Sequence, residues 1–192
     1  AEGGSSLTAV ELIKADDAKY IPFTGQRTTY RVLNKKHALK LQALGRSVAP
    51  GAGPRFVPAP GEAFLLWHYA LVSRGAALAR EFPDNRMYYL STNVLNWQME
   101  TYSALRRDLY ALGLGPFPCY SALSSGLHGI FLALRMCETV NLFGFSIDLP
   151  GVATRVHFRP IVERPSAAHS WAFDTLLLRL LDLSGRVNLC TA

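Results

Sequence analysis

Apolar residues recur along this chain with two different periods, which predict helices that alternate with strands. Helical spacing covers residues 35–44, 64–82, 96–112, 124–137 and 170–183. Runs rich in β-branched and aromatic residues predict strands at 28–33, 87–91, 139–145 and 187–190. Such alternation is typical of an α/β sandwich with a mostly parallel central sheet.

Three of the predicted helices have a defined apolar face. In Phe64–Phe82 this face consists of Leu65, Tyr69, Val72 and Ala76. In the helix that Ser124 opens it consists of Leu127, Ile130, Phe131 and Leu134. In the last helix it consists of Phe173, Leu176, Leu177, Leu180 and Leu181. Glycines at 113, 115 and 185 are expected to end the second and the last of the amphipathic helices.

A proline-rich segment, residues 47–61, interrupts this pattern. It holds Pro50, Pro54, Pro58 and Pro60 among glycine and alanine, which predicts a loop. There is no internal repeat, so residues 1–192 are predicted to form a single domain. The chain begins at Ala1 without a signal-peptide pattern, and we expect this domain to be incomplete at its N-terminus.

Composition narrows the classes of protein to consider. Hydrophobic residues make up 49% and charged residues 18%, which is typical of a globular domain. The net charge of +6 suits an anionic ligand. The basic residues form no stripe interleaved with aromatic residues, so nucleic acid is not an expected partner. No apolar run reaches the ~20 residues that a membrane helix needs.

The three cysteines are an odd set, so at least one is unpaired or bonded to something outside this chain. Cys119 and Cys137 are too far apart for a zinc knuckle, and the histidines show no spacing typical of metal ligands. We therefore expect no metal and no other cofactor.

Ser124, Ser125 and Gly126 are the first candidate site. A helix N-terminus offers unpaired N–H groups and the positive end of the macrodipole, and small residues let a phosphate approach the backbone. The same residues also fit a plain serine N-cap, which is the commoner role of such a sequence.

His169 and His157 are the second candidates. His169 directly precedes Ser170, the predicted N-cap of the last helix, with Asp174 in the first turn. A positive charge there opposes the macrodipole, which favours the neutral imidazole that a general base requires. His157 could neutralise a phosphate. A surface histidine and a structural histidine are the alternative interpretations.

In this order, the segments resemble the sialyltransferases of glycosyltransferase family 29. Leu123–Leu127 and Leu134–Phe145 look like the family's small motif, in which Pro-Ser-Ser/Thr-Gly opens an apolar helix followed by Cys-Asp-x-Val and a strand ending in Gly-Phe. Here Leu123 replaces the proline and Glu138 replaces the aspartate.

The other motifs of the family are matched more loosely. His169-x4-Asp174 resembles the very small motif, His-x4-Glu, and His157-Phe158 resembles the start of the third motif. Gly25–Arg31 is similar to the end of the large motif, and Asp16 falls where the family has a nucleotide-contacting asparagine. The beginning of the large motif is missing.

The resemblance implies a Rossmann-like variant of the single-domain glycosyltransferase fold and a metal-independent, inverting transfer from CMP-sialic acid to the hydroxyl of a glycan acceptor. Ser124, Ser125 and Gly126 would contact the donor, as would Asp16. His157 would assist the departing phosphate and His169 would take the acceptor proton. Cys137 would bond a cysteine upstream of Ala1. The whole protein would lie in the Golgi lumen, held by an N-terminal membrane anchor absent from this chain.

Two alternatives stay open. One is a transferase for another CMP-sugar, such as a Kdo-like acid, because its donor resembles sialic acid. The other is a non-catalytic, sialyltransferase-like binding domain, because the nucleotide loop of the large motif is missing from this chain.

Overall fold

The computed structural model describes residues 28–45, 58–117, 123–143, 145 and 169–190, and also the backbone of short strands at 7–9, 155–156 and 159–160. The chain divides into two compact units, residues 1–95 and 96–192. Both are mixed α/β structures with small sheets in which parallel pairing predominates. The expected coarse class, α/β, is therefore confirmed.

The first unit is built on a parallel sheet of four strands. These are β1 (Leu7–Ala9), β2 (Tyr30–Leu33), β3 (Ala63–Leu66) and β4 (Arg86–Tyr89), and they follow one another in the sheet in sequence order. Parallel neighbours need crossover connections. Helix α2 (Lys35–Gly45) connects β2 to β3, and the 3-10 helix η2 (Tyr69–Arg74) with α3 (Gly75–Glu81) connects β3 to β4.

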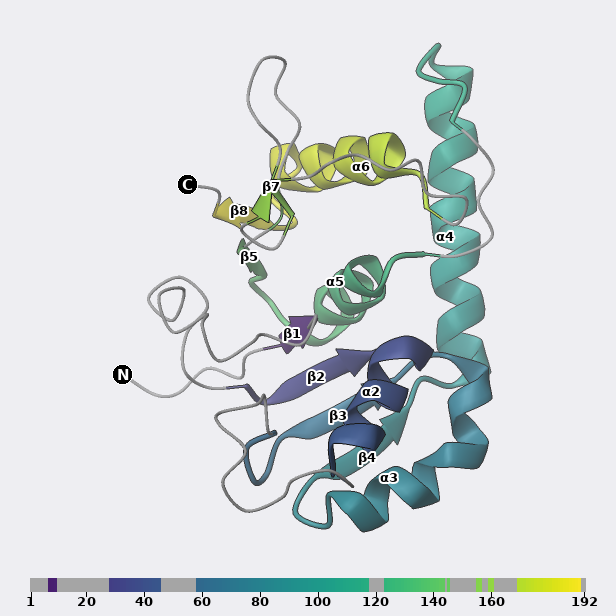
Figure 1. The fold of residues 1–192 in the computed structure, drawn as a ribbon. Coiled ribbons are helices and arrows are strands. Elements are labelled where there is room, and N and C mark those ends of the chain that lie inside the picture. Colours follow the sequence, from purple (N-terminus) through teal and green to yellow (C-terminus); the bar gives the residue numbers. More distant parts are fainter. Residues whose placement is uncertain are drawn as a thin grey trace. The chain divides into compact units, whose positions relative to one another are not determined.

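Helices α2 and α3 cover one face of this sheet (Figure 1). Alternate residues of β2 and β3 point into that layer, because side chains alternate across a strand. The resulting core consists of Leu33, Ala38, Leu41, Phe64, Leu66, Leu71 and Leu78. All four residues of β3 are buried, as expected for a central parallel strand.

A buried ion pair ties β2 to the start of β3. Arg31 is only 2% exposed, and its Nε and one terminal nitrogen donate to the two carboxylate oxygens of Glu62 at 2.8 and 2.7 Å. The Asn85 side chain donates to the backbone carbonyls of Ala59 and Glu62. A buried charge such as that of Arg31 requires a partner of opposite charge. The Arg31–Glu62 ion pair and the Asn85 hydrogen bonds together fix the turn that enters β3.

The prediction of one helix over Phe64–Phe82 is wrong. This segment forms β3, η2 and α3, and three members of the expected buried face, Tyr69, Val72 and Ala76, are exposed. The physical reason is that Phe64, Leu65 and Leu66 form a short continuous apolar run, which fits a buried strand as well as a helix. The buried positions of the two helices are Leu71, Gly75 and Leu78.

Gly75 allows α3 to approach β4 closely. A Cβ atom at this position would collide with the hydroxyl of Tyr89, which itself donates to the carbonyl of Leu71 at 3.3 Å. Burial raises the pKa of Tyr89, so this hydroxyl stays a donor at neutral pH.

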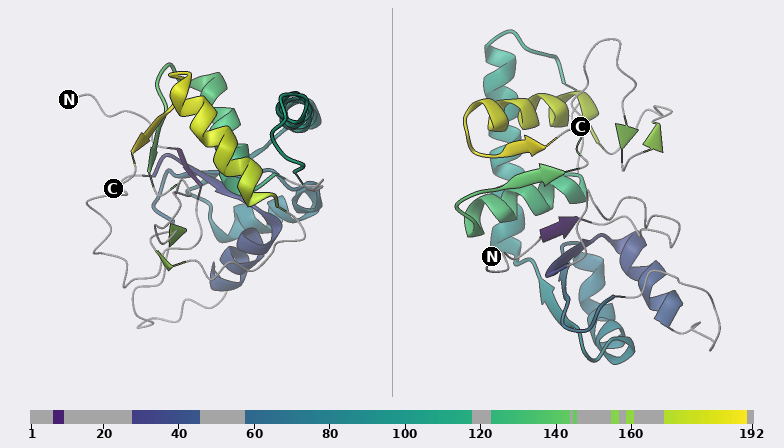
Figure 2. Two further views of the ribbon diagram at one scale, coloured as in Figure 1. Left: turned by 90° about the horizontal axis from the view of Figure 1, so that it is seen from above. Right: turned by 90° about the vertical axis from the view of Figure 1, so that its left-hand side faces the viewer.

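The second unit contains three helices and short strands. The helices are α4 (Thr92–Ala111), α5 (Ser125–Met136) and α6 (Trp171–Leu183). Strands β5 (Asn141–Phe143) and β8 (Asn188–Cys190) pair in parallel, and β6 (Arg155–Val156) and β7 (Arg159–Pro160) pair antiparallel. Figure 2 shows α5 and α6 running across the direction of α4.

Apolar faces of the three helices form the core of this unit. Its buried members include Tyr102 and Leu109 of α4, several residues of α5 and α6, and Val140, Leu142 and Val187 near the paired strands. Helix α4 ends at Ala111 and is followed by a glycine with positive φ, Gly113 (+83°), and α6 is followed by another, Gly185 (+69°). The three predicted helices and the two predicted strands of this unit are confirmed, with shifted ends.

Candidate active site

Helix α5 begins as the sequence predicts. Ser124 is its N-cap with extended backbone angles, and the Ser124 hydroxyl oxygen accepts a hydrogen bond from the Leu127 N–H at 3.2 Å. The N-cap role is therefore confirmed. Because a hydroxyl can accept one bond and donate another, this role leaves Ser124 able to donate to an anion.

Gly126 keeps the first turn of α5 close to the residues that follow β5. A Cβ atom here would lie 2.9 Å from Cε1 of the Phe145 ring, which is closer than real Cβ contacts come. The half-buried Phe145 packs against the same apolar core as α5. The small residue thus brings the helix N-terminus next to the end of the β5 segment.

His128, in the fourth position of α5, is buried and bonded to α4. Its ring Nδ1 lies 2.6 Å from Oε1 of Gln98, and Nε2 of Gln98 donates to the His128 carbonyl at 3.1 Å. Burial lowers the pKa of His128 to about 4, with a smaller contribution from the positive charge of His169. His128 is therefore neutral at physiological pH, and His169 lies close enough to affect it.

Asp174, in the fourth position of α6, makes the corresponding bond to α4. The Tyr102 hydroxyl donates to Oδ1 of Asp174 at 2.8 Å. Burial raises the pKa of Asp174 to about 6, and the Tyr102 hydrogen bond offsets part of that rise. Burial likewise raises the pKa of Tyr102, with the Asp174 charge as the next cause.

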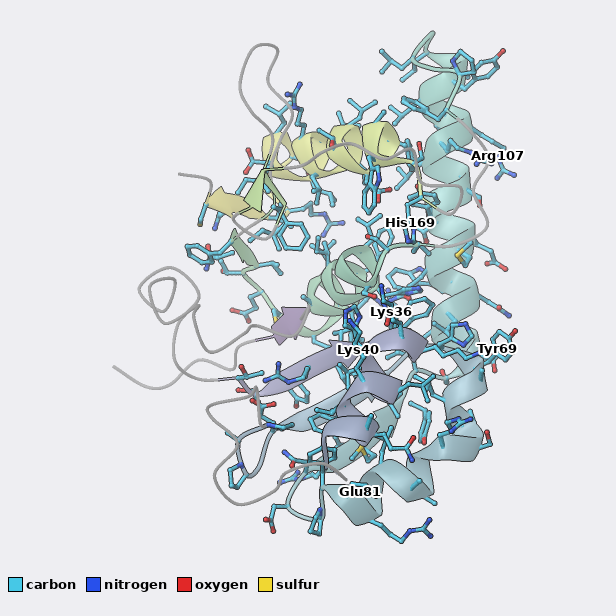
Figure 3. All side chains as sticks on the ribbon, viewed as in Figure 1. Lys36, Lys40, Tyr69, Glu81, Arg107 and His169 are labelled. Carbon is cyan, nitrogen blue, oxygen red and sulfur yellow. The ribbon has the colours of Figure 1, made fainter. Side chains whose placement is uncertain are left out.

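These three hydrogen bonds place the N-termini of α5 and α6 beside neighbouring turns of α4. Gln98 and Tyr102 are four residues apart, which corresponds to roughly 6 Å along a helix. Each side chain contacts the first turns of its partner helix. Figure 3 shows His169, the residue that precedes α6, between α5 and α6 and next to α4.

His169 and Ser170 form the entry to α6. The His169 ring is partly exposed and lies 5.2 Å from the Trp171 ring, at an interplanar angle of 47°. Ser170 occupies the N-cap position, but its side chain makes no capping bond. Its buried Oγ has no hydrogen-bond partner among the described residues. The α6 N-terminus therefore carries a ring that contacts Trp171 and a buried hydroxyl that makes no capping bond.

Ser124, Ser125 and Gly126 at the start of α5 and His169 at the entry to α6 lie in the second unit, where both helices are hydrogen-bonded to neighbouring turns of α4. Asp16 and His157 lie outside the described residues, as does Cys119. Cys137 is exposed at the C-cap of α5, and neither it nor Cys190 forms a disulfide within the described part of the chain. A bond from Cys137 to a residue upstream of Ala1 stays a prediction.

Sequence reasoning missed Gln98, Tyr102 and His128. A signal was present, because Gln98 and Tyr102 share one face of a predicted amphipathic helix. His128 was another signal, as a polar residue inside the apolar stretch of α5. A buried polar residue needs a partner, but the sequence did not indicate that these partners would be each other and Asp174.

The described residues contain no group of three or more histidine, cysteine, aspartate or glutamate side chains that could hold a metal ion. Within the same residues, no helix is long and apolar enough to span a membrane.

Comparison with known proteins identified no relative of this chain. No protein-family model, no curated protein and no solved structure matches the chain.

Proposed function

We propose that this chain is the C-terminal part of a sialyltransferase-type glycosyltransferase, which moves sialic acid from CMP-sialic acid to a sugar hydroxyl. The observation that supports this most is the set of hydrogen bonds from Gln98 and Tyr102 of α4 to α5 and α6. They hold the N-terminus of α5 and the entry to α6, where His169 lies, on neighbouring turns of α4.

The N-terminus of α5 would bind the donor. Its first N–H groups and the macrodipole favour a negative charge, and Ser124 and Ser125 add hydroxyl groups. At Gly126 the space that a side chain would occupy is taken by the Phe145 ring, so the donor would meet the N–H groups and the serine hydroxyls. Either the cytidine phosphate or the sialyl carboxylate has the charge this position favours.

His169 would act as the general base. The acceptor oxygen attacks the anomeric carbon while the bond from that carbon to the phosphate oxygen breaks, and the electron pair leaves with CMP. The proton of the acceptor hydroxyl passes to His169. One displacement of this kind inverts the anomeric centre and needs no covalent intermediate.

The neutral state of His128 suits this role of its neighbour. Since the pKa of His128 is about 4, it stays uncharged while His169 accepts a proton. Two adjacent imidazolium ions would repel each other, and a neutral His128 avoids that cost.

Further parts of the proposal rest on the family resemblance. They are a Rossmann-like sandwich, a single catalytic domain over 1–192, donor contact by Asp16, phosphate assistance by His157 and catalysis without a metal. A Golgi-lumenal protein with an N-terminal anchor, and a disulfide from Cys137 to an upstream cysteine, belong to the same set.

Calorimetry with CMP and a transfer assay with CMP-sialic acid, both on the full-length protein, test the proposal. His169→Ala should lower kcat by roughly a hundredfold or more while CMP affinity changes less than about twofold. Ser125→Ala should weaken CMP binding about tenfold. The controls are His68→Ala and Ser73→Ala, which lie in the first unit.

Four outcomes would contradict the proposal in different ways. Absence of CMP binding by the full-length protein would exclude both enzyme interpretations. Turnover only with a different CMP-sugar would favour the Kdo-like alternative. CMP binding without transfer from any CMP-sugar would favour the non-catalytic domain, and undiminished turnover by His169→Ala would exclude His169 as the base.

A further inference from the structure

A shallow pocket lies at the amino ends of β2, β3 and β4, within the first unit. It has a volume of about 100 Å³ and is lined by Thr29, Tyr30, Gly61, Ala63, Arg86 and Tyr88. Residues that alternate with the lining residues, Phe64 and Met87, contact the α2 and α3 layer. The pocket therefore opens on the opposite face of the sheet.

The strand register explains why this surface is hollow. Tyr30, Ala63 and Arg86 stand directly opposite one another on three neighbouring strands. The middle residue has only a methyl group, so two long side chains border a trough with a small floor. Gly61, with φ of +83° and nothing within 4 Å of a Cβ position, leaves one end of the trough without a side chain.

The pocket carries a single positive charge. Arg86 is the one charged residue in the lining, it is exposed, and it has no hydrogen-bond or ion-pair partner among the described residues. Glu62 is adjacent to the floor in sequence, but its carboxylate binds Arg31. A planar guanidinium without a protein partner is suited to a carboxylate, which it can bind through two parallel hydrogen bonds.

The two tyrosines of the pocket offer contacts for the uncharged part of a ligand. Tyr30 and Tyr88 present rigid rings with hydroxyl groups, and Tyr88 is 43% exposed. Such side chains combine an apolar surface with hydrogen bonding at low conformational-entropy cost. A sugar ring has both an apolar face and hydroxyl groups to match them.

Size and charge limit the ligand. Sites for drug-sized molecules or cofactors occupy roughly 300–1,000 Å³, so this pocket has room for part of one ring and not for a nucleotide. One guanidinium matches the single charge of a carboxylate better than a phosphate monoester, which carries about −1.5 to −2.

We infer that this pocket binds a carboxylate-bearing sugar ring, with Arg86 on the carboxylate and Tyr30 and Tyr88 on the ring. This inference does not rest on the proposed transfer activity, because the pocket lies within residues 1–95 and its test measures binding alone.

NMR titration of the full chain tests this inference, with amide shifts followed at residues 29–30, 61–63 and 86–88. The probes are N-acetylneuraminic acid, glucuronic acid, neutral N-acetylglucosamine, acetate and inorganic phosphate. Both acidic sugars, or one of them, should bind about tenfold or more tightly than the neutral sugar and acetate. Which acid binds better identifies the class of acidic sugar.

Variants separate the charge from the ring. Arg86→Gln should weaken binding of the acidic sugar about tenfold or more. The affinity of Arg86→Lys should lie between that of Arg86→Gln and that of the parent. Tyr88→Ala should weaken binding several-fold. Arg80→Gln and Tyr69→Ala change exposed residues of the same types outside the pocket and should leave binding within about twofold. Equal binding of the neutral sugar or of acetate, tighter binding of phosphate, or an unchanged affinity in Arg86→Gln would overturn the inference.

Discussion

At the scale of single residues, the amide of Gln98 determines which ring nitrogen of His128 carries the proton. A backbone carbonyl can only accept, so the atom of Gln98 that faces the His128 carbonyl must be its nitrogen. The Gln98 oxygen therefore faces Nδ1 of His128, and Nδ1 must be the donor. This leaves the lone pair of the neutral ring on Nε2.

Gln98→Met tests this arrangement. The substitution keeps a side chain of similar length but removes both hydrogen bonds, which leaves the Nδ1–H and the carbonyl of His128 buried without this partner. We expect a loss of about 1–3 kcal/mol in the free energy of unfolding, chiefly from the Nδ1–H, because the carbonyl lies within α5 and keeps the hydrogen bond of its own helix. Urea unfolding, followed by the NMR amide signals of α5, measures this loss.

The control for this experiment is Glu100→Ala, two residues away on the exposed side of α4. It should change stability by less than about 0.5 kcal/mol. The ring signals of His128 provide a second measurement. In Gln98→Met the Nδ1–H tautomer should no longer be the one species observed, and an unchanged ring spectrum together with unchanged stability would contradict the assignment.

Helix N-caps were the part of the candidate site that sequence could predict. Ser124 was identified from residue type and position alone, because capping depends on local backbone geometry. Ser170 was identified in the same way and occupies the N-cap position of α6, but its side chain makes no capping bond. The bonds from Gln98 and Tyr102 join residues 30 and 72 positions apart. No local pattern specifies such distant partners, so these residues became visible only in the folded unit.

At the scale of elements, α4 is the part that aligns α5 with α6. Its Tyr102 bonds to Asp174 while the Tyr102 ring packs against Phe173, with ring centroids 4.6 Å apart in an edge-to-face arrangement. The same residue thus contributes both a hydrogen bond and apolar burial. Of these two contributions, only the hydrogen bond depends on whether the Asp174 carboxyl is ionised.

Tyr102→Phe isolates that hydrogen bond. Because the ring stays, the substitution should cost about 1.5–3 kcal/mol at neutral pH, typical of a hydrogen bond to a charged group. The pKa of Asp174 should rise above its present value of about 6, because the lost bond was lowering it. Urea unfolding and the pH titration of the Asp174 carboxyl signal by NMR measure the two effects.

Tyr110→Phe is the matched control, since Tyr110 lies on the same helix and is 63% exposed. It should leave both stability and the Asp174 titration unchanged. Equal effects of the two substitutions would mean that the Asp174 bond does not contribute to holding α6 on α4.

The elements also show where sequence patterns succeed and fail. Helices α4, α5 and α6 follow from helical periodicity, and strands β2, β4, β5 and β8 follow from runs rich in β-branched and aromatic residues. The segment from β3 to α3 was not predicted correctly, because β3 is buried on both faces and therefore lacks the alternation of apolar and polar residues that marks a strand. Gly75 lies at the entrance to α3, and neither it nor the buried Leu71 shows in the helical spacing that was predicted.

At the scale of the whole molecule, two buried groups of opposite type shape how stability depends on pH. The pKa of Asp174 is raised from 3.8 to about 6 on folding. Its contribution to stability is therefore fully present below pH 3.8 and is lost as pH rises through about 6. This loss amounts to roughly 3 kcal/mol.

His128 acts in the opposite direction. Its pKa is lowered from 6.5 to about 4 on folding, because burial disfavours the charged ring. Its contribution is therefore present above pH 6.5 and is lost as pH falls from 6.5 towards 4. This loss is also roughly 3 kcal/mol. Between pH 4 and 6.5 the two contributions nearly cancel, so neither can be recognised from the parent protein alone.

Asp174→Asn separates them. The asparagine oxygen can still accept the Tyr102 hydrogen bond, but the group no longer titrates, so the His128 contribution is left unbalanced. Relative to the parent, the variant should lose roughly 2–3 kcal/mol of stability when the pH is lowered from 6.5 to 4. Urea titrations at several pH values, read from the amide signals of α6, give this difference directly, and Asp108→Asn at an exposed position of α4 is the control. If Asp174→Asn shows the same dependence of stability on pH as the parent, the contributions of the Asp174 carboxyl and the His128 imidazole do not offset each other.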